Sequence, residues 1–111
     1  MKPAEKPQVV FALYRPHKGK DAELRRLIVR HLPVLRRMEM ITNRPAALVR
    51  SKNGTYIEVF EWRSAAMSGR AHEHPEVARL WEAMGQVADF PGLESLEEAK
   101  ERFPHFEPVV L

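Results

Sequence analysis

The dipeptide Asn53-Gly54 lies between two largely apolar runs, and it restricts the fold more than any other feature. Ala46 to Lys52 precede it, and Thr55 to Trp62 follow it. Asn-Gly in this setting favours a β-hairpin closed by a type I′ turn, in which both central residues have a positive φ. We therefore predict two antiparallel strands in which Val49 opposes Glu58.

This register divides the hairpin into two faces, because successive residues of a strand point to opposite sides. One face would carry Tyr56, Glu58, Phe60, Trp62, Val49 and Ala47. The other would carry Ile57, Val59, Glu61, Leu48, Ala46 and Arg50. Since both faces are largely apolar, we expect both to be covered.

The residues before the hairpin predict a strand and then a helix. Val9 to Arg15 form a short apolar run that Pro16 ends, as is typical of a strand. Asp21 is a favourable N-cap, and apolar residues then recur at helical spacing as far as Met38. Pro33 lies inside this pattern and is expected to kink the helix.

The residues after the hairpin predict a broken second helix, a small extra helix and a last strand. Pro75 suits the first position of the main part of the second helix. Ser95 and Glu98 fit a capping box, which predicts a helix over Leu96 to Phe103. His105 to Leu111 are expected to form an edge strand, because this stretch contains a proline.

The order strand-helix-strand-strand-helix-strand is that of a ferredoxin-like α+β fold with a four-stranded antiparallel sheet. We expect residues 1–8 to form a flexible arm and residues 9–111 a single domain. Both helices would cover one face of the sheet. The other face would carry Phe11, Leu13, Leu48, Ile57 and Val59. Since an exposed apolar face of this size is rare on a monomer, we predict a homodimer that packs sheet against sheet.

The composition excludes several functional classes. The chain contains no cysteine, which excludes disulfides, thiolate zinc sites and a cysteine nucleophile. No apolar run approaches the roughly 20 residues that span a bilayer, and MKPAEKPQ lacks the apolar centre of a signal peptide. We therefore expect a cytoplasmic protein with no membrane partner. The arginines of the first helix have no aromatic residues between them, so we expect a solvated face and no nucleic acid.

From Val9 to Leu111 the sequence resembles the dimeric α+β-barrel superfamily and, within it, the antibiotic-biosynthesis-monooxygenase-like proteins. The resemblance rests on a strand EVFEW followed by a helix that contains AHEHPEV. It implies a dimeric, ferredoxin-like protein. Members include cofactor-free monooxygenases of polyketide quinones, haem-degrading monooxygenases, muconolactone-isomerase-like enzymes and proteins without a known activity, so the fold does not define the function.

The resemblance bears on the cofactor through three residues. Trp62 and His72 are ten residues apart, and in the haem-degrading branch a tryptophan and the axial histidine are similarly placed. That branch also has an asparagine near the end of its first strand, where this sequence has Tyr14. The cofactor-free branch uses a tryptophan with Tyr, Asn or Arg to hold an anionic substrate. The resemblance thus favours an enzyme without a cofactor and leaves haem as the alternative.

Seven side chains are candidates for a site between the sheet and the helices. The candidate catalytic residues are His72, Trp62 and Tyr14, and the candidate substrate-binding residues are Phe60, Glu58, Trp81 and His31. Each group also has a structural interpretation. Aromatic side chains on a buried face usually form core, and a histidine at a helix end or beside a proline kink often binds a backbone group. A glutamate on a strand is often solvated or paired with an arginine.

We therefore predict a monooxygenase-type enzyme that acts on a small aromatic or quinone-type molecule. In this hypothesis Trp62 shapes the pocket, His72 moves or holds a proton, and Tyr14 hydrogen-bonds a phenolate or carbonyl oxygen. No metal is expected at His72-Glu73-His74, because residues i and i+2 of a helix point to different sides. The alternatives are a non-catalytic dimeric ligand-binding or stress-response module and an isomerase or lactone-type enzyme that uses Glu58 and His72.

Overall fold

A computed structural model describes residues 6–111, and residues 1–5 of the predicted arm lie outside it. The helices are α1 (Asp21–Arg37), α2 (Met67–Glu73) and α3 (Pro75–Val87), with two short 3-10 turns, η1 (Leu93–Ser95) and η2 (Glu97–Lys100). The strands are β1 (Gln8–Pro16), β2 (Ala47–Arg50), β3 (Tyr56–Trp62), β4 (Ala88–Asp89) and β5 (Glu107–Pro108). No helix of the described part is long and apolar enough to cross a membrane.

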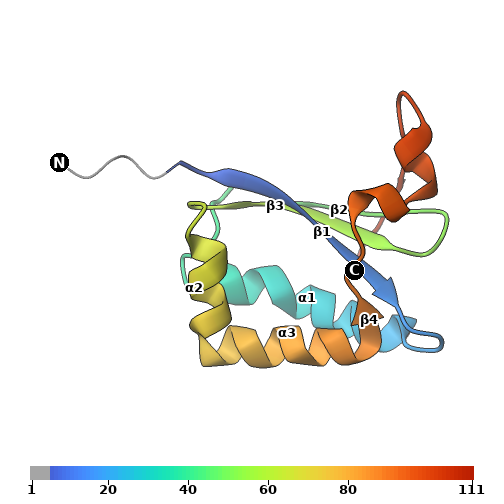
Figure 1. The fold of residues 1–111 in the computed structure, drawn as a ribbon. Helices are drawn as coiled ribbons and strands as arrows, with labels where there is room; N and C mark the ends of the chain where they lie inside the picture. The colour runs from blue at the N-terminus through green and yellow to red at the C-terminus, as the bar shows by residue number, and fades with distance from the viewer. Residues whose placement is uncertain (1–5) are drawn as a thin grey trace.

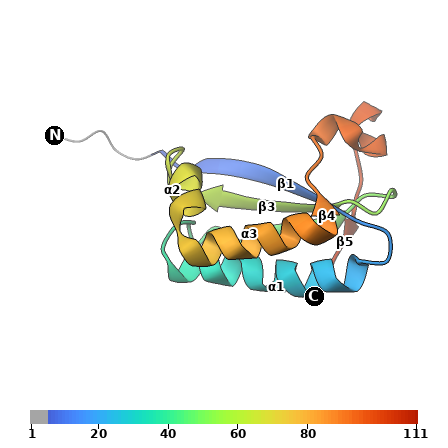
Figure 2. The same cartoon turned by 60° about the horizontal axis from the view of Figure 1, so that its bottom comes forward.

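The fold is ferredoxin-like α+β. One antiparallel sheet has the strand order β4-β1-β3-β2-β5. The three helices lie together on one side of this sheet, which we call the helix face, with α1 and α3 side by side (Figures 1 and 2). The second helix is broken as predicted, and Pro75 begins α3.

The fourth strand of this fold is β4, which the sequence did not predict. It follows α3 directly and pairs with β1 through Arg15 and Asp89. The strand predicted for residues 105–111 is only two residues long, as β5, and it pairs with β2 at the opposite edge. The sheet therefore has five strands and not four.

The hairpin forms, but the predicted register is wrong by one residue. Val49 pairs with Ile57, not Glu58. The loop has three residues, because Ser51 N–H donates to the Thr55 carbonyl at 2.9 Å and Gly54 N–H donates to the Ser51 carbonyl at 2.9 Å. Gly54 has a φ of 90°, and Asn53 has no positive φ. This is a type I turn followed by a glycine bulge.

The shifted register exchanges the two faces of β2 and leaves those of β3 as predicted. Leu48 now lies on the helix face, where it packs against the main core. Val49 lies on the opposite face of the sheet, which we call the far face, together with Ile57 and Val59.

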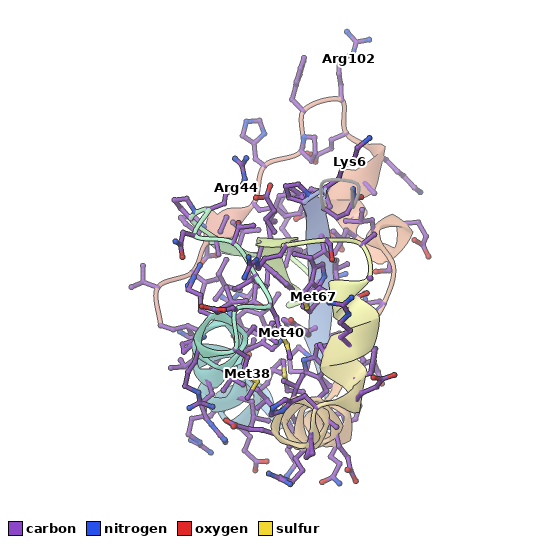
Figure 3. All side chains as sticks on the ribbon, turned by 90° about the vertical axis from the view of Figure 1, so that its left-hand side faces the viewer. Lys6, Met38, Met40, Arg44, Met67 and Arg102 are labelled. Atoms are coloured by element: carbon purple, nitrogen blue, oxygen red, sulfur yellow. The ribbon has the colours of Figure 1, made fainter. Side chains whose placement is uncertain are left out.

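The far face is partly covered by the chain itself, contrary to the sequence expectation. Residues 93–106, which we call the C-terminal segment, rise on the side of the sheet opposite the helices (Figure 1). Leu96 of this segment buries Leu13 and Ile57. Phe11 is still 52% exposed. Arg102 lies at the tip of the segment, away from the helices (Figure 3).

The small helix predicted in the C-terminal segment is absent from the structure, which has the 3-10 turns η1 and η2 there. Glu98 does not complete a capping box with Ser95. Its carboxylate accepts hydrogen bonds from the Ser51 hydroxyl at 2.6 Å and the Lys52 N–H at 3.0 Å. The carboxylate therefore ties the segment to the hairpin loop.

The first helix begins one residue away from the predicted cap. Lys20 is the N-cap, and Asp21 is the first helical residue. The Asp21 carboxylate accepts a hydrogen bond from the Tyr56 hydroxyl at 2.7 Å, so it ties the helix to the sheet. The helix continues through Pro33. Met38 and Met40 after α1, and Met67 in α2, pack against one end of the core (Figure 3).

Candidate active site

A cavity of about 320 Å³ lies between the helix face of the sheet and the helices. This volume is at the lower end of the range of small-molecule pockets. The cavity is lined by Val10, Ala12, Tyr14, His31, Phe60, Trp62, Ser68, His72, Trp81, Met84 and Phe90. Six of the seven candidate residues from the sequence are among these, and the seventh, Glu58, is hydrogen-bonded to two of them.

The pairing of β1 with β3 explains how the sheet supplies this wall. Ala12 is opposite Glu58 and Val10 is opposite Phe60. Tyr14 comes two residues after Ala12 and therefore points to the same side as Glu58. His31 reaches the same point from the buried stripe of α1, which also contains Leu24, Ile28 and Leu35.

A hydrogen-bonded network of three buried side chains lies at the cavity wall. The Tyr14 hydroxyl donates to Glu58 Oε1 at 2.8 Å. His31 Nδ1 lies 2.7 Å from the same oxygen and 3.4 Å from the Tyr14 hydroxyl. We call these three residues the Tyr14–Glu58–His31 network. Trp81 extends it, because its Nε1–H donates to His31 Nε2 at 2.9 Å.

The network is almost completely removed from solvent. His31, Glu58 and Tyr14 are 2%, 3% and 5% exposed. Burial raises the pKa of Tyr14 well above its ordinary value, and the charge of Glu58 and the hydrogen bond to it raise this pKa further. The Tyr14 hydroxyl is therefore protonated at neutral pH and acts as a donor. Neither solvent nor an arginine balances Glu58, contrary to the structural interpretation of this residue.

Aromatic rings form most of the remaining wall. The ring centroids of Phe60 and Trp62 are 5.2 Å apart, and those of Trp62 and Trp81 are 6.4 Å apart, in edge-to-face arrangements. The Phe90 ring meets the Tyr14 ring edge to face at 5.9 Å and is 56% exposed. Phe90 therefore lies where the cavity opens to solvent.

His72 and Trp62 both line the cavity, as the sequence predicted, but their surroundings differ. Trp62 is buried, whereas His72 is on the exposed side of α2. The His72 ring meets the Trp81 ring edge to face, with centroids 4.5 Å apart. His72 thus lies at the rim of the cavity, on the outer side of Trp81.

Sequence reasoning missed some of the wall. Phe90, Ser68 and Met84 line the cavity but are not among the seven candidates from the sequence. The one available signal for Phe90 was the Pro-Gly dipeptide that follows it, because this dipeptide marks a turn. Within the described part of the chain, no group of three or more histidine, aspartate or glutamate side chains is placed to hold a metal ion.

Comparisons with known proteins concern the fold. No family model matches the chain, and no curated protein matches it. Among solved structures, a mutant of SnoaB, a cofactor-independent oxygenase from Streptomyces nogalater, is similar with a TM-score of 0.65 and 19% identity, over 89% of this chain and 98% of that one. Tetracenomycin F2 cyclase from Streptomyces glaucescens, a type-II polyketide cyclase, is similar with a TM-score of 0.54 and 18% identity, over 94% of this chain and 92% of that one.

These similarities concern the fold alone, because both identities are below 20%. The fold class is that of ferredoxin-like α+β domains with a cavity between sheet and helices. The fold is shared with a cofactor-independent oxygenase and with a polyketide cyclase, as the resemblance in the sequence led us to expect for the fold.

Proposed function

We propose that the protein is a cofactor-independent, monooxygenase-type enzyme that acts on a small hydroxylated aromatic or quinone-type molecule in the cavity. The observation that carries this proposal is the Tyr14–Glu58–His31 network at the wall of an otherwise apolar cavity. The stability of the core does not require this network, since well-packed apolar side chains often replace buried ionic groups without loss of stability. Titratable groups gathered in a cavity are typical of active sites.

The cavity walls suit a flat organic substrate. The rings of Phe60, Trp62 and Trp81 offer faces and edges to an aromatic molecule, and burial of its apolar surface contributes roughly 25 cal/mol per Å². The network supplies the few polar atoms that orient such a ligand.

The network accepts the substrate proton in the first chemical step. An acidic O–H or C–H of the substrate lies against the Tyr14 oxygen. The substrate proton moves to this oxygen while the Tyr14 proton moves to Glu58 Oε1 along the existing 2.8 Å hydrogen bond. The network gains one proton, and the substrate becomes a delocalised carbanion or phenolate.

The substrate anion then reacts with oxygen without help from a cofactor. One electron passes from the anion to O₂, and the two radicals combine to form a peroxide at carbon. The peroxide anion takes the proton back from the network, and loss of water from the resulting hydroperoxide leaves a carbonyl group. For a substrate CH₂ group the sum is CH₂ + O₂ → C=O + H₂O, so atoms and electrons balance. The fold shared with SnoaB, a cofactor-independent oxygenase, supports a reaction with oxygen that needs no cofactor.

An oxygen electrode and a panel of dihydroxyanthrones test the proposal. We expect oxygen uptake equal to substrate loss, and we expect Tyr14→Phe and Glu58→Gln each to lower kcat by about 100-fold. Tyr56→Phe is the matched control, because Tyr56 is also a buried tyrosine that donates to a carboxylate, but it does not line the cavity. Equal rates for the Tyr14 and Tyr56 variants would contradict the proposal.

Other outcomes point to other chemistry. Substrate loss without oxygen uptake would indicate a cyclisation, the activity named for the second structural neighbour. A Soret shift on haemin titration that disappears in His72→Ala would indicate a haem enzyme, with His72 as the ligand.

The alternative function is a non-catalytic ligand-binding or stress-response module. One observation favours it: both ring nitrogens of His31, the Tyr14 hydroxyl and Glu58 Oε1 already have partners within the protein and need none from a ligand. In that case thermal shift assays would show ligand binding in the cavity, and the oxygen electrode would show no turnover.

We also propose that the protein is a homodimer in which a second copy covers the far face. An apolar groove of about 340 Å³ lies between this face and the C-terminal segment. Phe11, which lines this groove, is 52% exposed, and Val9 on the same strand is 53% exposed. A continuous apolar surface of this kind is typical of an interface.

A further inference from the structure

We propose that Trp81 is a positioning residue that fixes His31 in the tautomer with its proton on Nδ1. The hydrogen-bond distances alone carry the tautomer assignment. Its catalytic consequence rests on the proposed function, because it concerns the proton path through Tyr14 and Glu58.

The indole of Trp81 determines which His31 nitrogen carries the proton. An indole N–H is a donor only, and it lies 2.9 Å from His31 Nε2. Nε2 must therefore present its lone pair. A neutral imidazole has one donor and one acceptor nitrogen, so the proton is on Nδ1. From there it points to Glu58 Oε1 at 2.7 Å.

The opposite tautomer would break two contacts at once. With the proton on Nε2, two donors would face each other between Trp81 and His31. On the other side, the lone pair of Nδ1 would face the Glu58 oxygen at 2.7 Å, which places two acceptors together. A second proton on His31 would produce the same donor–donor conflict with Trp81. The arrangement is thus satisfied by one protonation pattern only.

The packing around His31 and Trp81 restricts rotation of both rings, so the two hydrogen bonds of His31 cannot easily be exchanged for others. His31 is 2% exposed, and its ring centroid lies 5.7 Å from that of Phe60 and 6.2 Å from that of Tyr14, both nearly perpendicular. On its outer side, the Trp81 ring is in contact with His72 at 4.5 Å between centroids. His72 therefore braces the indole from the rim of the cavity.

The tautomer decides where the Tyr14 proton points. When Nδ1 carries a proton it cannot accept one from the Tyr14 hydroxyl, although the two atoms are 3.4 Å apart. The hydroxyl then has one acceptor, Glu58 Oε1 at 2.8 Å. If Nδ1 were an acceptor, the Tyr14 hydroxyl could donate its hydrogen bond either to Nδ1 or to Glu58 Oε1. Trp81 thus directs the proton path to Glu58 without touching the reacting atoms.

Nitrogen NMR of the ligand-free protein, labelled with ¹⁵N in histidine and tryptophan, tests the tautomer directly. We expect His31 Nδ1 to show the shift of a protonated nitrogen and Nε2 that of an unprotonated one at pH 7. A scalar coupling between Trp81 Nε1 and His31 Nε2 across the hydrogen bond is also expected. Protonated Nε2 in the wild-type protein would overturn the proposal, and this measurement needs no variant.

Trp81→Phe tests the cause of this tautomer, because it keeps an aromatic ring and removes the N–H. We expect the Nε2 shift of His31 to move, because Nε2 is no longer held as an acceptor by the indole N–H, while Nδ1 keeps its contact with Glu58 Oε1. Trp62→Phe is the matched control, since it removes an indole from the same cavity wall but not the one bound to His31. It should leave the His31 shifts in place. Unchanged His31 shifts in Trp81→Phe would show that Trp81 is not the cause.

Turnover provides the second readout. We expect Trp81→Phe to lower kcat by about tenfold with little change in KM, because one buried hydrogen bond is lost and the substrate still binds. Since the NMR measurement uses no substrate, the tautomer assignment stands or falls separately from the oxygenase proposal. A changed Nε2 shift with an unchanged kcat would overturn the positioning role.

Discussion

At the scale of the residue, the unusual feature is a carboxylate in the aromatic core. Glu58 is 3% exposed, and its hydrogen-bond partners are the phenol of Tyr14 and the imidazole of His31. Neither partner is a lysine or an arginine that would neutralise the carboxylate. Burial of such a group costs several kcal/mol unless donors replace the lost water. The two donors on Oε1 are therefore a condition for Glu58 to be in this position.

This dependence predicts different results for two substitutions of the same residue. Glu58→Ala leaves the Tyr14 hydroxyl and the His31 Nδ1–H without their acceptor, and we expect it to lower the free energy of unfolding by about 3 kcal/mol. Glu58→Gln keeps an acceptor oxygen and should cost about 1 kcal/mol. Urea unfolding measures both. Equal stability of the two variants would mean that the acceptor is not what the core requires.

At the scale of the element, two features of the hairpin region show what local sequence determines. Period-two alternation correctly placed Tyr56, Phe60 and Trp62 on one face of β3, because this alternation depends only on the strand. The predicted register was wrong because the Asn-Gly dipeptide is compatible with two hairpin loops of different length. A type I′ turn needs a positive φ at both residues, whereas a type I turn with a bulge needs it at Gly54 only. The difference is one residue in the loop, and nearby residues do not decide it.

Gly54 is therefore expected to be the conformationally constrained position of the loop. With its φ of 90°, Gly54→Ala is strained although nothing lies within 4 Å of an added Cβ. We expect a loss of about 1 kcal/mol in the free energy of unfolding. Gly69→Ala is the control, because Gly69 lies inside α2 with equally open space, and there alanine should stabilise. A neutral Gly54→Ala in denaturant unfolding would contradict the turn assignment.

The C-terminal segment gives a prediction about acid. The hydrogen bond from Ser51, and then that from the Lys52 N–H, lower the pKa of Glu98. A carboxyl whose pKa is lower in the folded state contributes stability above its unfolded pKa of about 4.3, and this contribution is lost as the pH falls through the folded value. We therefore expect the segment to loosen below about pH 4.

Hydrogen exchange measures this loosening. Amides of residues 93–106 should lose protection as the pH is lowered, after correction for the intrinsic rate. In Glu98→Gln the protection should be weak already at neutral pH and change little with acid. An acid response that is the same in the variant and the wild type would exclude Glu98 as the anchor.

At the scale of the whole molecule, the sequence predicted the layers better than the connections between them. The helix face, the broken second helix and the aromatic cavity followed from periodicity and breakers. The His31–Glu58 contact did not, because residues 27 positions apart are paired by the tertiary packing of α1 on β3. The two-residue strand β4 is too short to show any period. The spacing of Ser95 and Glu98 predicted a helix cap, but Ser51 provides Glu98 with a better partner.

The proposed dimer is the prediction at this scale. Light scattering after size-exclusion chromatography should give twice the chain mass of 12.9 kDa at micromolar concentration. Phe11→Glu should give the monomer, because it places a charge on the far face. Phe103→Glu is the control, since Phe103 is 74% exposed in the C-terminal segment and outside the far face. A wild-type mass near that of a single chain would contradict the dimer.

The buried carboxylate has one more consequence, which concerns what enters the cavity. Among residues 6–111, no lysine or arginine lies within salt-bridge distance of Glu58. An anionic ligand would be repelled by the Glu58 carboxylate, because the protein interior screens charges poorly, whereas an uncharged ligand would not be repelled. Under the proposed function, we therefore expect an acid to enter the cavity in its uncharged form and to lose its proton only after entry. For a series of phenols, affinity should follow the un-ionised fraction in solution and not the total concentration.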